Sequence, residues 1–340
     1  MAGGIKKSNP GITIVAGGYH PTVVPSEVMS DRNFDFVVVG EGEDTIIEWL
    51  DAYESGKDNF SSIDGLVHRK GDSIIQNRKR ALIEDVDHLP LPAYDLLRID
   101  RYGSFVSTSS HFTTFIRSRG CPFNCIFCGV QEMFGRRYRC QSPGKTISDI
   151  DILAEKFHIK EILFKDSDFL IDRSNVEKLC ELLVKRGYGI AWSCNARVDG
   201  VNEQILRSMK MAGCKSITYG IESGSQDILD YLKKDINLSQ AVRAMELTRK
   251  CGIRSTANII FGCPGETMES VEETLKFVKK LDPDYANFAY LAAFPGSQLY
   301  GEALRKKWFI GDKPDSYDIE HLRINATGMT DEELSKVLKY

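Results

Sequence analysis

The chain of 340 residues lacks any apolar run of the roughly 20 residues that a transmembrane helix needs. Its first residues, Met1-Ala-Gly-Gly-Ile-Lys-Lys, also lack the apolar segment of a secretory signal. Neither sign of charge dominates, because 44 Lys and Arg face 48 Asp and Glu, which gives a net charge of −4. We therefore expect neither a nucleic-acid partner nor a membrane span.

A cysteine pattern typical of a disulfide framework is also missing. Five of the nine cysteines stand alone among apolar residues, where we expect small core residues. They are Cys180, Cys194, Cys214, Cys251 and Cys263. Nine cysteines without a secretion signal fit a reducing compartment, so we predict a cytoplasmic protein.

The most informative feature that is present is a cysteine cluster, Cys121-Pro-Phe-Asn-Cys125-Ile-Phe-Cys128. Its C-x3-C-x2-C spacing directly follows a strand-like run over residues 112–118. Three thiolates so close together can hold three irons of a [4Fe-4S] cubane and leave the fourth iron open to a small molecule. The motif therefore predicts redox chemistry at a bound cofactor.

A structural zinc site is the alternative, because such sites use four protein ligands. Cys140 lies twelve residues after Cys128 and would complete a set of four cysteines. The chain would then be a non-catalytic binding protein stabilised by zinc or a cluster. Replacing Cys140 by Ser distinguishes the two hypotheses, since only the zinc site needs that thiol.

Residues 1–58 have the pattern of an α/β fragment. Two short apolar runs, 12–16 and 34–39, end in the glycine turns Gly17-Gly18 and Gly40-Glu-Gly-Glu43. Strands that end in glycine turns are typical of the ligand-binding edge of an open parallel sheet.

Residues 59–105 are predicted to form a β-hairpin and a linker. The hairpin would turn at Lys70-Gly71-Asp72. Two prolines one residue apart, in Leu89-Pro-Leu-Pro-Ala-Tyr94, disfavour helix and extend the chain.

From about residue 106 onward, strand and helix patterns alternate. This alternation predicts parallel βα units over residues 106–300, followed by the start of a C-terminal extension over residues 301–340. Six units fall short of the eight in a full barrel. The strand-like runs are 112–118, 160–165, 189–195, 215–221, 253–261 and 285–292.

Polar or glycine-rich sequences follow these predicted strands, where active-site groups of parallel βα proteins lie. Each has an ordinary structural explanation as a helix cap, a turn or an ion pair. Their joint occurrence at one edge of the sheet favours a shared ligand site. The candidates are Asp166 and Asp168, Asn195 and Arg197, Glu222 and Ser223, and Ile260 and Gly262, which lie at the ends of the second to fifth strands in that order.

The chain resembles the radical S-adenosylmethionine (SAM) superfamily from about residue 110 to 300. The cysteine spacing, the aromatic Phe127 before the third cysteine and the lead-in Arg117-Ser-Arg-Gly120 carry this resemblance. It implies a partial (β/α)6 barrel with a [4Fe-4S] cluster on the three cysteines and SAM on the open iron. One electron would cleave SAM to methionine and a 5′-deoxyadenosyl radical.

The same resemblance assigns SAM contacts to the strand ends. Asp166-Ser-Asp168 matches a paired-acid variant of the segment that meets the SAM amino group. Asn195 and Arg197 match a polar position near the ribose or carboxylate, and so do Glu222 and Ser223. No catalytic residue is assigned beyond the ligands of the cluster and SAM.

Ile260-Phe-Gly262 matches the segment that backs the adenine of SAM. The chain departs from the family pattern beside it, with Asn258 where glycine is common and Cys263 where leucine is common. The adenine contacts are therefore the least specific part of the match.

Residues 11–50 and the linker resemble the late part of the cobalamin (B12)-binding domain of B12-dependent radical SAM proteins. The earlier strands of that domain, and the Asp-x-His-x-x-Gly loop that can supply a cobalt ligand, do not occur in the chain. We interpret residues 1–58 as a truncated Rossmann-like, cobalamin-binding-type segment of a longer protein. Cobalamin is expected of that full-length parent and is left open for this chain.

Together these resemblances imply an enzyme that activates a C–H bond of a small-molecule substrate. The outcome would be C-methylation or an oxidative cyclisation like that of the anaerobic porphyrin cyclases. A methylthiotransferase-type activity is the alternative within the superfamily. Electrons would come from a donor such as flavodoxin or ferredoxin.

Overall fold

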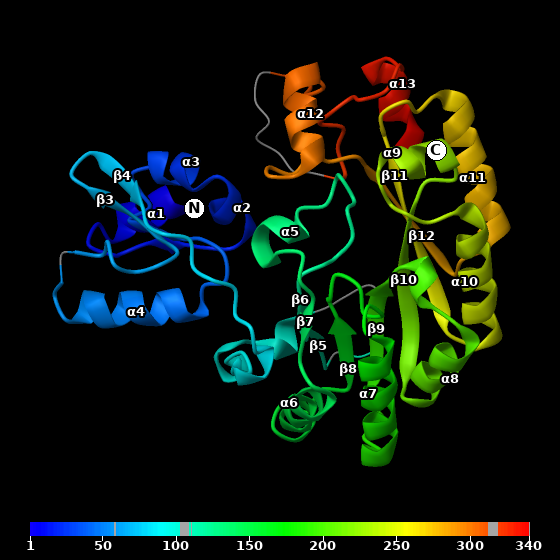
Figure 1. Cartoon of the computed structure of the whole chain (residues 1–340), viewed down its shortest axis with the longest axis horizontal. Coiled ribbons are helices and arrows are strands. Elements are labelled where there is room, and N and C mark those ends of the chain that lie inside the picture. The colour runs from blue at the N-terminus through cyan, green and yellow to red at the C-terminus, as the bar shows by residue number, and fades with distance from the viewer. Residues whose placement is uncertain (58, 103–108, 110, 312–318, 340) are drawn as a thin grey trace.

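The structure is a computed structural model that describes residues 1–57, 59–102, 109, 111–311 and 319–339. It has a smaller N-terminal α/β part and a larger βα part, joined by an extended segment (Figure 1). The predicted domain boundary between residues 105 and 106 lies outside the described residues, and the domain division stays a prediction.

The N-terminal part contains a four-stranded sheet in the order β1-β2-β3-β4. β1 (Val15–Ala16) and β2 (Phe36–Val38) are parallel. The predicted hairpin forms β3 (Leu66–Lys70) and β4 (Ser73–Gln76), and β3 pairs antiparallel with β2. The hairpin that we placed with the linker therefore continues the sheet of the first two strands.

Helices cover both faces of this sheet (Figure 1). Phe36 packs with Trp49 on one face, whereas its neighbour Val37 packs with Met29 on the other. Successive strand residues point to opposite faces, so β2 divides its apolar side chains between two small cores. The helices are α1 (Ala2–Ser8), α2 (Tyr19–Val23) and α3 (Pro25–Ser30), with α4 (Glu43–Glu54) on the face of Trp49.

The linker runs without α-helix or strand from residue 77 to residue 102 and has only short 3-10 turns. Tyr94 fixes it to the larger part, because its buried hydroxyl donates to the Thr114 carbonyl oxygen at 3.0 Å. The linker is thus held beside the first strand of the second sheet. Its turns are Val86–His88, Tyr94–Leu96 and Ile99–Arg101.

The larger part is built on a six-stranded sheet in the order β12-β11-β10-β9-β8-β5. Every neighbouring pair is parallel. Since β5 and β12 are the two edges, the sheet is an open partial barrel, and the prediction of six parallel βα units is confirmed. The strands are β5 (Phe112–Phe115), β8 (Glu161–Phe164), β9 (Ala191–Ala196), β10 (Cys214–Glu222), β11 (Arg254–Phe261) and β12 (Tyr285–Tyr290).

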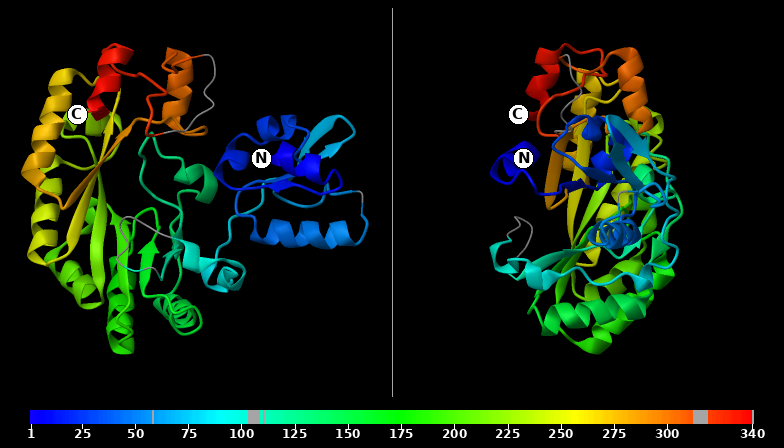
Figure 2. Two further views of the ribbon diagram at one scale, coloured as in Figure 1. Left: turned by 180° about the vertical axis from the view of Figure 1, so that it is seen from behind. Right: turned by 90° about the vertical axis from the view of Figure 1, so that its left-hand side faces the viewer.

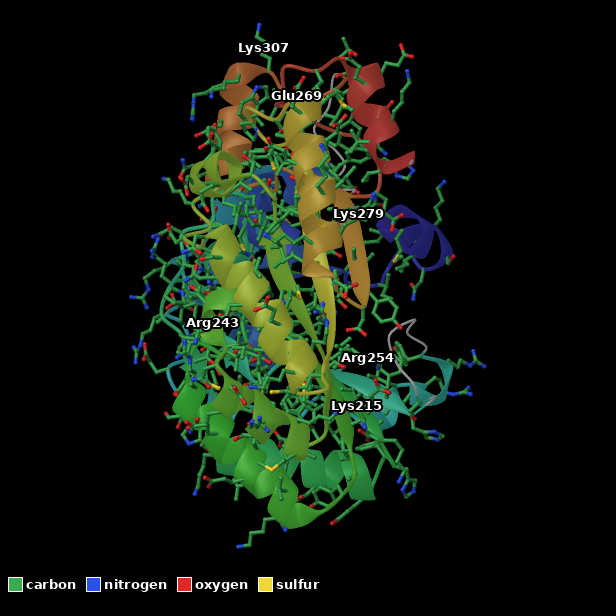
Figure 3. The ribbon with its side chains drawn as sticks, turned by 90° about the vertical axis from the view of Figure 1, so that its right-hand side faces the viewer. Lys215, Arg243, Arg254, Glu269, Lys279 and Lys307 are labelled. Carbon is green, nitrogen blue, oxygen red and sulfur yellow. The ribbon has the colours of Figure 1, made fainter. Side chains whose placement is uncertain are left out.

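Amphipathic helices cover the outer face of this sheet. Figure 3 looks onto two of them, with Arg243 and Lys279 pointing away from the sheet. Gly187 ends one helix at φ 68°, a left-handed conformation that glycine adopts readily. The covering helices are α6 (Pro143–Glu155), α7 (Arg173–Arg186), α8 (Glu203–Met211), α10 (Leu238–Lys250) and α11 (Met268–Leu281).

The inner face of the sheet carries small polar side chains. In β10, Ile217 and Tyr219 belong to the core under the helices, so Ser216 and Thr218 point to the opposite face. Neighbouring strands add further hydroxyl and amide groups. Ser193 and Ser216 lie 2.9 Å apart, and Asn287 donates to Asn258 at 3.0 Å.

Further short elements connect the strands or follow the sheet. None of the helices that the structure describes combines the length and apolar character needed to cross a bilayer. The short elements are β6 (Ser118–Arg119), β7 (Arg139–Cys140), α5 (Val130–Phe134), α9 (Gln226–Tyr231), α12 (Gln298–Lys306) and α13 (Asp331–Lys336).

Candidate active site

The two ends of the cysteine loop lie side by side. β6 and β7 pair antiparallel, with Arg119 opposite Arg139, so the loop is closed at its base. Gly120 has φ 82°, and a Cβ there would lie 2.1 Å from the Arg137 carbonyl oxygen. Only glycine fits this close approach of two backbone segments. The three cysteines therefore sit in a loop whose ends are joined.

Hydrogen bonds also fix the middle of the loop. The Gln131 amide donates to the Phe123 carbonyl oxygen across the loop. The Ile126 N–H donates to the Leu232 carbonyl at 3.1 Å, and its carbonyl accepts from the Leu299 N–H at 2.9 Å. The segment between the second and third cysteines is thus attached to the residue after α9 on one side and to α12 on the other.

The three cysteines lie close enough together for their charges to interact. Burial, together with the charges of Cys128 and Cys125, raises the pKa of the Cys121 thiol. Within the described residues, no three or more His, Cys, Asp or Glu side chains are placed to share one metal ion. In a cubane each thiolate ligates its own iron, so its cysteines do not meet at one point. A set of three half-buried thiolates in one loop fits a [4Fe-4S] cluster.

Cys140 has different surroundings. Arg117 Nη1 donates to its sulfur at 3.1 Å, and its other charged neighbours include Asp166. Burial raises the pKa of this thiol, although the guanidinium opposes the effect. A four-cysteine zinc site needs Cys140 among the loop cysteines, so this placement speaks against the zinc alternative.

Asp166 and Asp168 follow β8 and are almost fully buried. The Ser118 hydroxyl donates to Oδ1 of Asp166, whereas Oδ2 has no hydrogen-bond partner among the described residues. Asp168 Oδ1 accepts the backbone N–H groups of Leu170 at 3.0 Å and Arg197 at 3.4 Å. Burial raises the pKa of both carboxyl groups. A cationic ligand group would relieve this cost of burial.

Arg197 connects the end of β9 to the cysteine loop. Its guanidinium lies 3.8 Å from the centroid of the Phe123 ring and pairs with Asp199 at 3.0 Å. Burial alone would lower the pKa of Arg197, but the Asp199 carboxylate outweighs it and the pKa is raised. Nη1 has no hydrogen-bond partner among the described residues. The neighbouring Asn195 is half-buried on the inner face of the sheet.

Glu222 ends β10 in an unusual conformation. Its φ is 69°, and the register of β10 shifts between Gly220 and Glu222. The carboxylate accepts a hydrogen bond from Lys234 Nζ at 2.6 Å, and both side chains are only 8% exposed. The ammonium lies 5.9 Å from the centroid of the Phe127 ring, and it is a close electrostatic neighbour of Cys125. The bulge thus brings a buried ion pair to the cysteines.

The remaining predicted residues differ in where they lie. Ser223 is fully buried, and its hydroxyl lies 3.4 Å from Thr274 of α11. Ile260 packs against a small apolar cluster that includes Ile126 of the cysteine loop. Gly262 follows β11 at φ 93°. The strand-end residues gathered at the loop are thus Asp168, Arg197, Glu222 and Ile260. Asp166 meets the base of the loop at Ser118, whereas Ser223 is directed to a covering helix.

Sequence reasoning missed Lys234 and Glu266. Lys234 lies in a charged run after α9, where nothing in the sequence indicates a buried cation. Glu266 Oε2 accepts the backbone N–H groups of Gly262 and Cys263, while Oε1 has no hydrogen-bond partner among the described residues. Burial raises the pKa of Glu266 to about 7. The available signal was its place in the turn Gly262-Cys-Pro-Gly-Glu266.

Two cavities flank the cysteine loop. One of about 500 Å³ is lined by Cys125, Cys128 and the segment 296–298. The other, of about 560 Å³, is lined by Phe123 and Asp168 among other residues. A larger, mainly apolar cavity of about 800 Å³ lies along β5 and the linker. Because only the cavity of about 500 Å³ of these three is lined by cysteines of the loop, we place the reacting centre there.

Comparison with known proteins identifies the family of the chain. The model of the radical SAM superfamily matches residues 115–278, and the model of the B12 binding domain matches residues 1–50. An uncharacterized methyltransferase of Pyrococcus horikoshii is 35% identical over 335 residues, which cover 98% of this chain and 72% of that protein. The chain belongs to the radical SAM superfamily, whose members are enzymes that use a [4Fe-4S] cluster and SAM.

Two further similar proteins are a porphyrin-ring cyclase and a methyltransferase of known structure. The anaerobic magnesium-protoporphyrin IX monomethyl ester cyclase of Rubrivivax gelatinosus is 30% identical over 321 residues, 93% of this chain and 56% of that protein. The fold matches the radical SAM methyltransferase TsrM of Kitasatospora setae, solved with cobalamin and a [4Fe-4S] cluster. The TM-score is 0.74 at 17% identity, over 92% of this chain and 62% of that one. The chain thus spans only part of each relative.

Proposed function

We propose that this chain is the core of a cobalamin-associated radical SAM enzyme that activates a C–H bond of a small-molecule substrate. The observation that carries the proposal is the convergence of buried charge on the cysteine loop. Arg197 stacks on Phe123, and the Lys234–Glu222 pair lies beside Cys125 and Phe127. Such buried charges are costly unless they are paired or serve a ligand.

The proposed roles follow from the chemistry of each side chain. The three cysteines hold the cluster, which leaves one iron without a protein ligand. Asp166 and Asp168 are anionic acceptors suited to the ammonium of SAM, and Arg197 and Lys234 are cations suited to its carboxylate. When bound, the cluster and SAM supply a one-electron reductive cleavage that yields methionine and a 5′-deoxyadenosyl radical.

The inner face of the sheet would receive the neutral parts of SAM and substrate. Its hydroxyl and amide groups, such as Thr218 and Asn258, are half-buried and can exchange hydrogen bonds with a ribose or a base. Asn195 lies beside Thr218 in the sheet register and belongs to the same surface. Ile260 and Gly262 lie at the end of β11, where the adenine is predicted.

The outcome of the reaction is C-methylation or oxidative cyclisation in this proposal. A methyltransferase and a porphyrin-ring cyclase are both among the relatives, which supports this pair of outcomes. The match of residues 1–50 to the B12 binding domain supports cobalamin in the longer protein. An electron donor such as flavodoxin or ferredoxin in a reducing cytoplasm would supply the electron.

The test is anaerobic reconstitution with iron and sulfide, followed by reduction, addition of SAM and measurement of 5′-deoxyadenosine. Cys125→Ala removes one of three cluster ligands, so we expect product to fall at least about 100-fold, comparable to the loss of a metal-site group. Cys140→Ser is the matched control, because it removes a thiol that accepts a hydrogen bond from Arg117 and is not a proposed cluster ligand. It should keep both iron content and product.

Two results would contradict the proposal. One is a parent chain that carries a full iron–sulfur load and binds SAM but forms no nucleoside. The other is loss of metal in Cys140→Ser together with zinc in the purified parent chain, which would restore the four-cysteine alternative.

A further inference from the structure

The turn between β2 and α4 carries two glutamates that reach the base of the cysteine loop. Glu41, whose side chain is 1% exposed, accepts from Arg139 Nη1 at 2.9 Å and lies 2.8 Å from Nη2. Glu43 pairs with Arg119 on the facing strand β6. Because Arg119 and Arg139 lie opposite each other where the loop closes, the N-terminal part neutralises both arginines at that base.

A second contact holds the loop further along. The Tyr19 hydroxyl of α2 donates to the Pro295 carbonyl oxygen at 2.7 Å. A Cβ at Gly129 would lie 1.9 Å from the Tyr19 oxygen, so the ring rests on the backbone directly after Cys128. α2 faces α5 in Figure 1 and also in the view from behind in Figure 2. The loop is therefore held by the N-terminal part at its base and just after its third cysteine.

Removal of the Glu41 carboxylate would leave a buried charge without its counterion. The Arg139 side chain is 3% exposed, and its other acceptors are the carbonyl oxygens of Ile83 and Phe134. A guanidinium buried without a carboxylate is strongly unfavourable, so β7 would have to move toward water. Such a movement would separate β7 from β6 and open the loop.

We propose that the turn Gly40–Glu43 is a clamp that sets the shape of the cysteine loop, with Glu41 as its positioning residue. The N-terminal part then has a role in cluster binding that is separate from any ligand of its own. This inference rests on the proposed function, because it concerns the loop that would hold the cluster. It adds a dependence of cluster geometry on residues about 80 positions away in the sequence.

The first readout needs no cluster. Arg136 and Arg137 are exposed trypsin sites inside the loop. In the apo-protein, Glu41→Gln should raise the rate of tryptic cleavage there roughly tenfold, because cleavage follows the population of the opened loop. Glu48→Gln is the control, since it breaks an ion pair between α4 and Arg80 of the linker that does not involve the loop. It should leave the cleavage rate unchanged.

The second readout is the reconstituted cluster itself. We expect Glu41→Gln to bind less iron and to give an altered electron paramagnetic resonance spectrum of the reduced cluster, both with and without SAM. A general loss of stability would not change the spectrum of the molecules that remain folded. If Glu41→Gln does not fold, Glu43→Gln tests the same clamp, because the Glu43 side chain is 37% exposed and its loss is milder.

The outcomes separate the clamp from the proposed function. Parent-like cleavage and a parent-like spectrum in the folded variant would overturn the clamp, whatever the enzyme does. A parent chain that binds no cluster would overturn the proposed function, while the cleavage experiment on apo-protein would still decide whether the clamp exists.

Discussion

The two sheets of this molecule use their faces differently. The four-stranded sheet has helices on both faces, and β2 sends Phe36 to one core and Val37 to the other. The six-stranded sheet has one large core under its helices, which includes Ile217. Its other face carries Ser216 and Thr218, side chains that can bind a ligand.

This difference explains where the chemistry is expected. A sheet covered on both faces can contact other groups only through its edges and turns. In the N-terminal part, Glu41 and Tyr19 make such contacts with the cysteine loop. A sheet with an uncovered face can surround a ligand at the ends of its strands. In our proposal the smaller sheet therefore supports the cysteine loop, and the larger sheet provides the surface that binds SAM and substrate.

The largest effect should come from destabilising the four-stranded sheet, which helices cover on both faces. Trp49→Ala removes a buried ring that lies 5.2 Å from Phe36, centroid to centroid. We expect the local stability of the N-terminal part to fall by about 3–5 kcal/mol. Hydrogen exchange measured by mass spectrometry should show lost protection in β2 and β3 but not in β9 to β11. Equal loss in both sheets would mean that the two parts unfold as one unit.

The second prediction compares the two faces of one strand. Ile259 lies in the core under the helices, and its neighbour Asn258 lies on the inner face. Ile259→Ala should cost about 2–5 kcal/mol in the free energy of unfolding. Asn258→Ala loses a half-buried hydrogen bond to Asn287 and should cost about 1 kcal/mol or less. Urea denaturation of both variants is the measurement, and similar costs would refute the assignment of the faces.

The third prediction concerns a charge at the end of β11. Burial raises the pKa of Glu266 from 4.5 to about 7, so the native state holds this proton more tightly than the unfolded chain does. Stability should therefore fall as pH rises between those two values and then level off. At roughly 1.4 kcal/mol per pKa unit, the total is about 3 kcal/mol.

Glu266→Gln isolates this effect, because a glutamine oxygen can still accept the N–H groups of Gly262 and Cys263. The variant should lose the pH dependence in that window and become more stable than the parent above neutral pH. Unfolding curves measured at several pH values would show this. A parallel pH dependence in the two proteins would exclude Glu266 as its source.

The fold was largely predictable because its signals are local. Strand and helix periods and the glycine at Gly187 identify the βα units without knowledge of any distant contact. The rule that strand ends share one edge then brings Asp168 and Arg197 together, as the structure does. Their assignment to SAM remains a prediction.

Pairs that join distant segments were not predictable. Glu41 and Arg139 are 98 residues apart, and neither has a local pattern that indicates a buried partner. The role of Lys234 depends on the bulge in β10, which places Glu222 beside it and is not indicated by the sequence. The hairpin was recognised, but its pairing with β2 depends on a register that the sequence of the hairpin alone does not specify.

The conformation of Glu222 also constrains how this edge can evolve. A residue other than glycine at φ 69° costs about 1–2 kcal/mol. Glycine would relax the backbone but would leave the Lys234 ammonium buried beside no carboxylate, and loss of Lys234 would leave the carboxylate in the same position. Neither single substitution is neutral, so the two residues can change only together. A lineage that carries this pair is therefore expected to retain it even while the substrate changes.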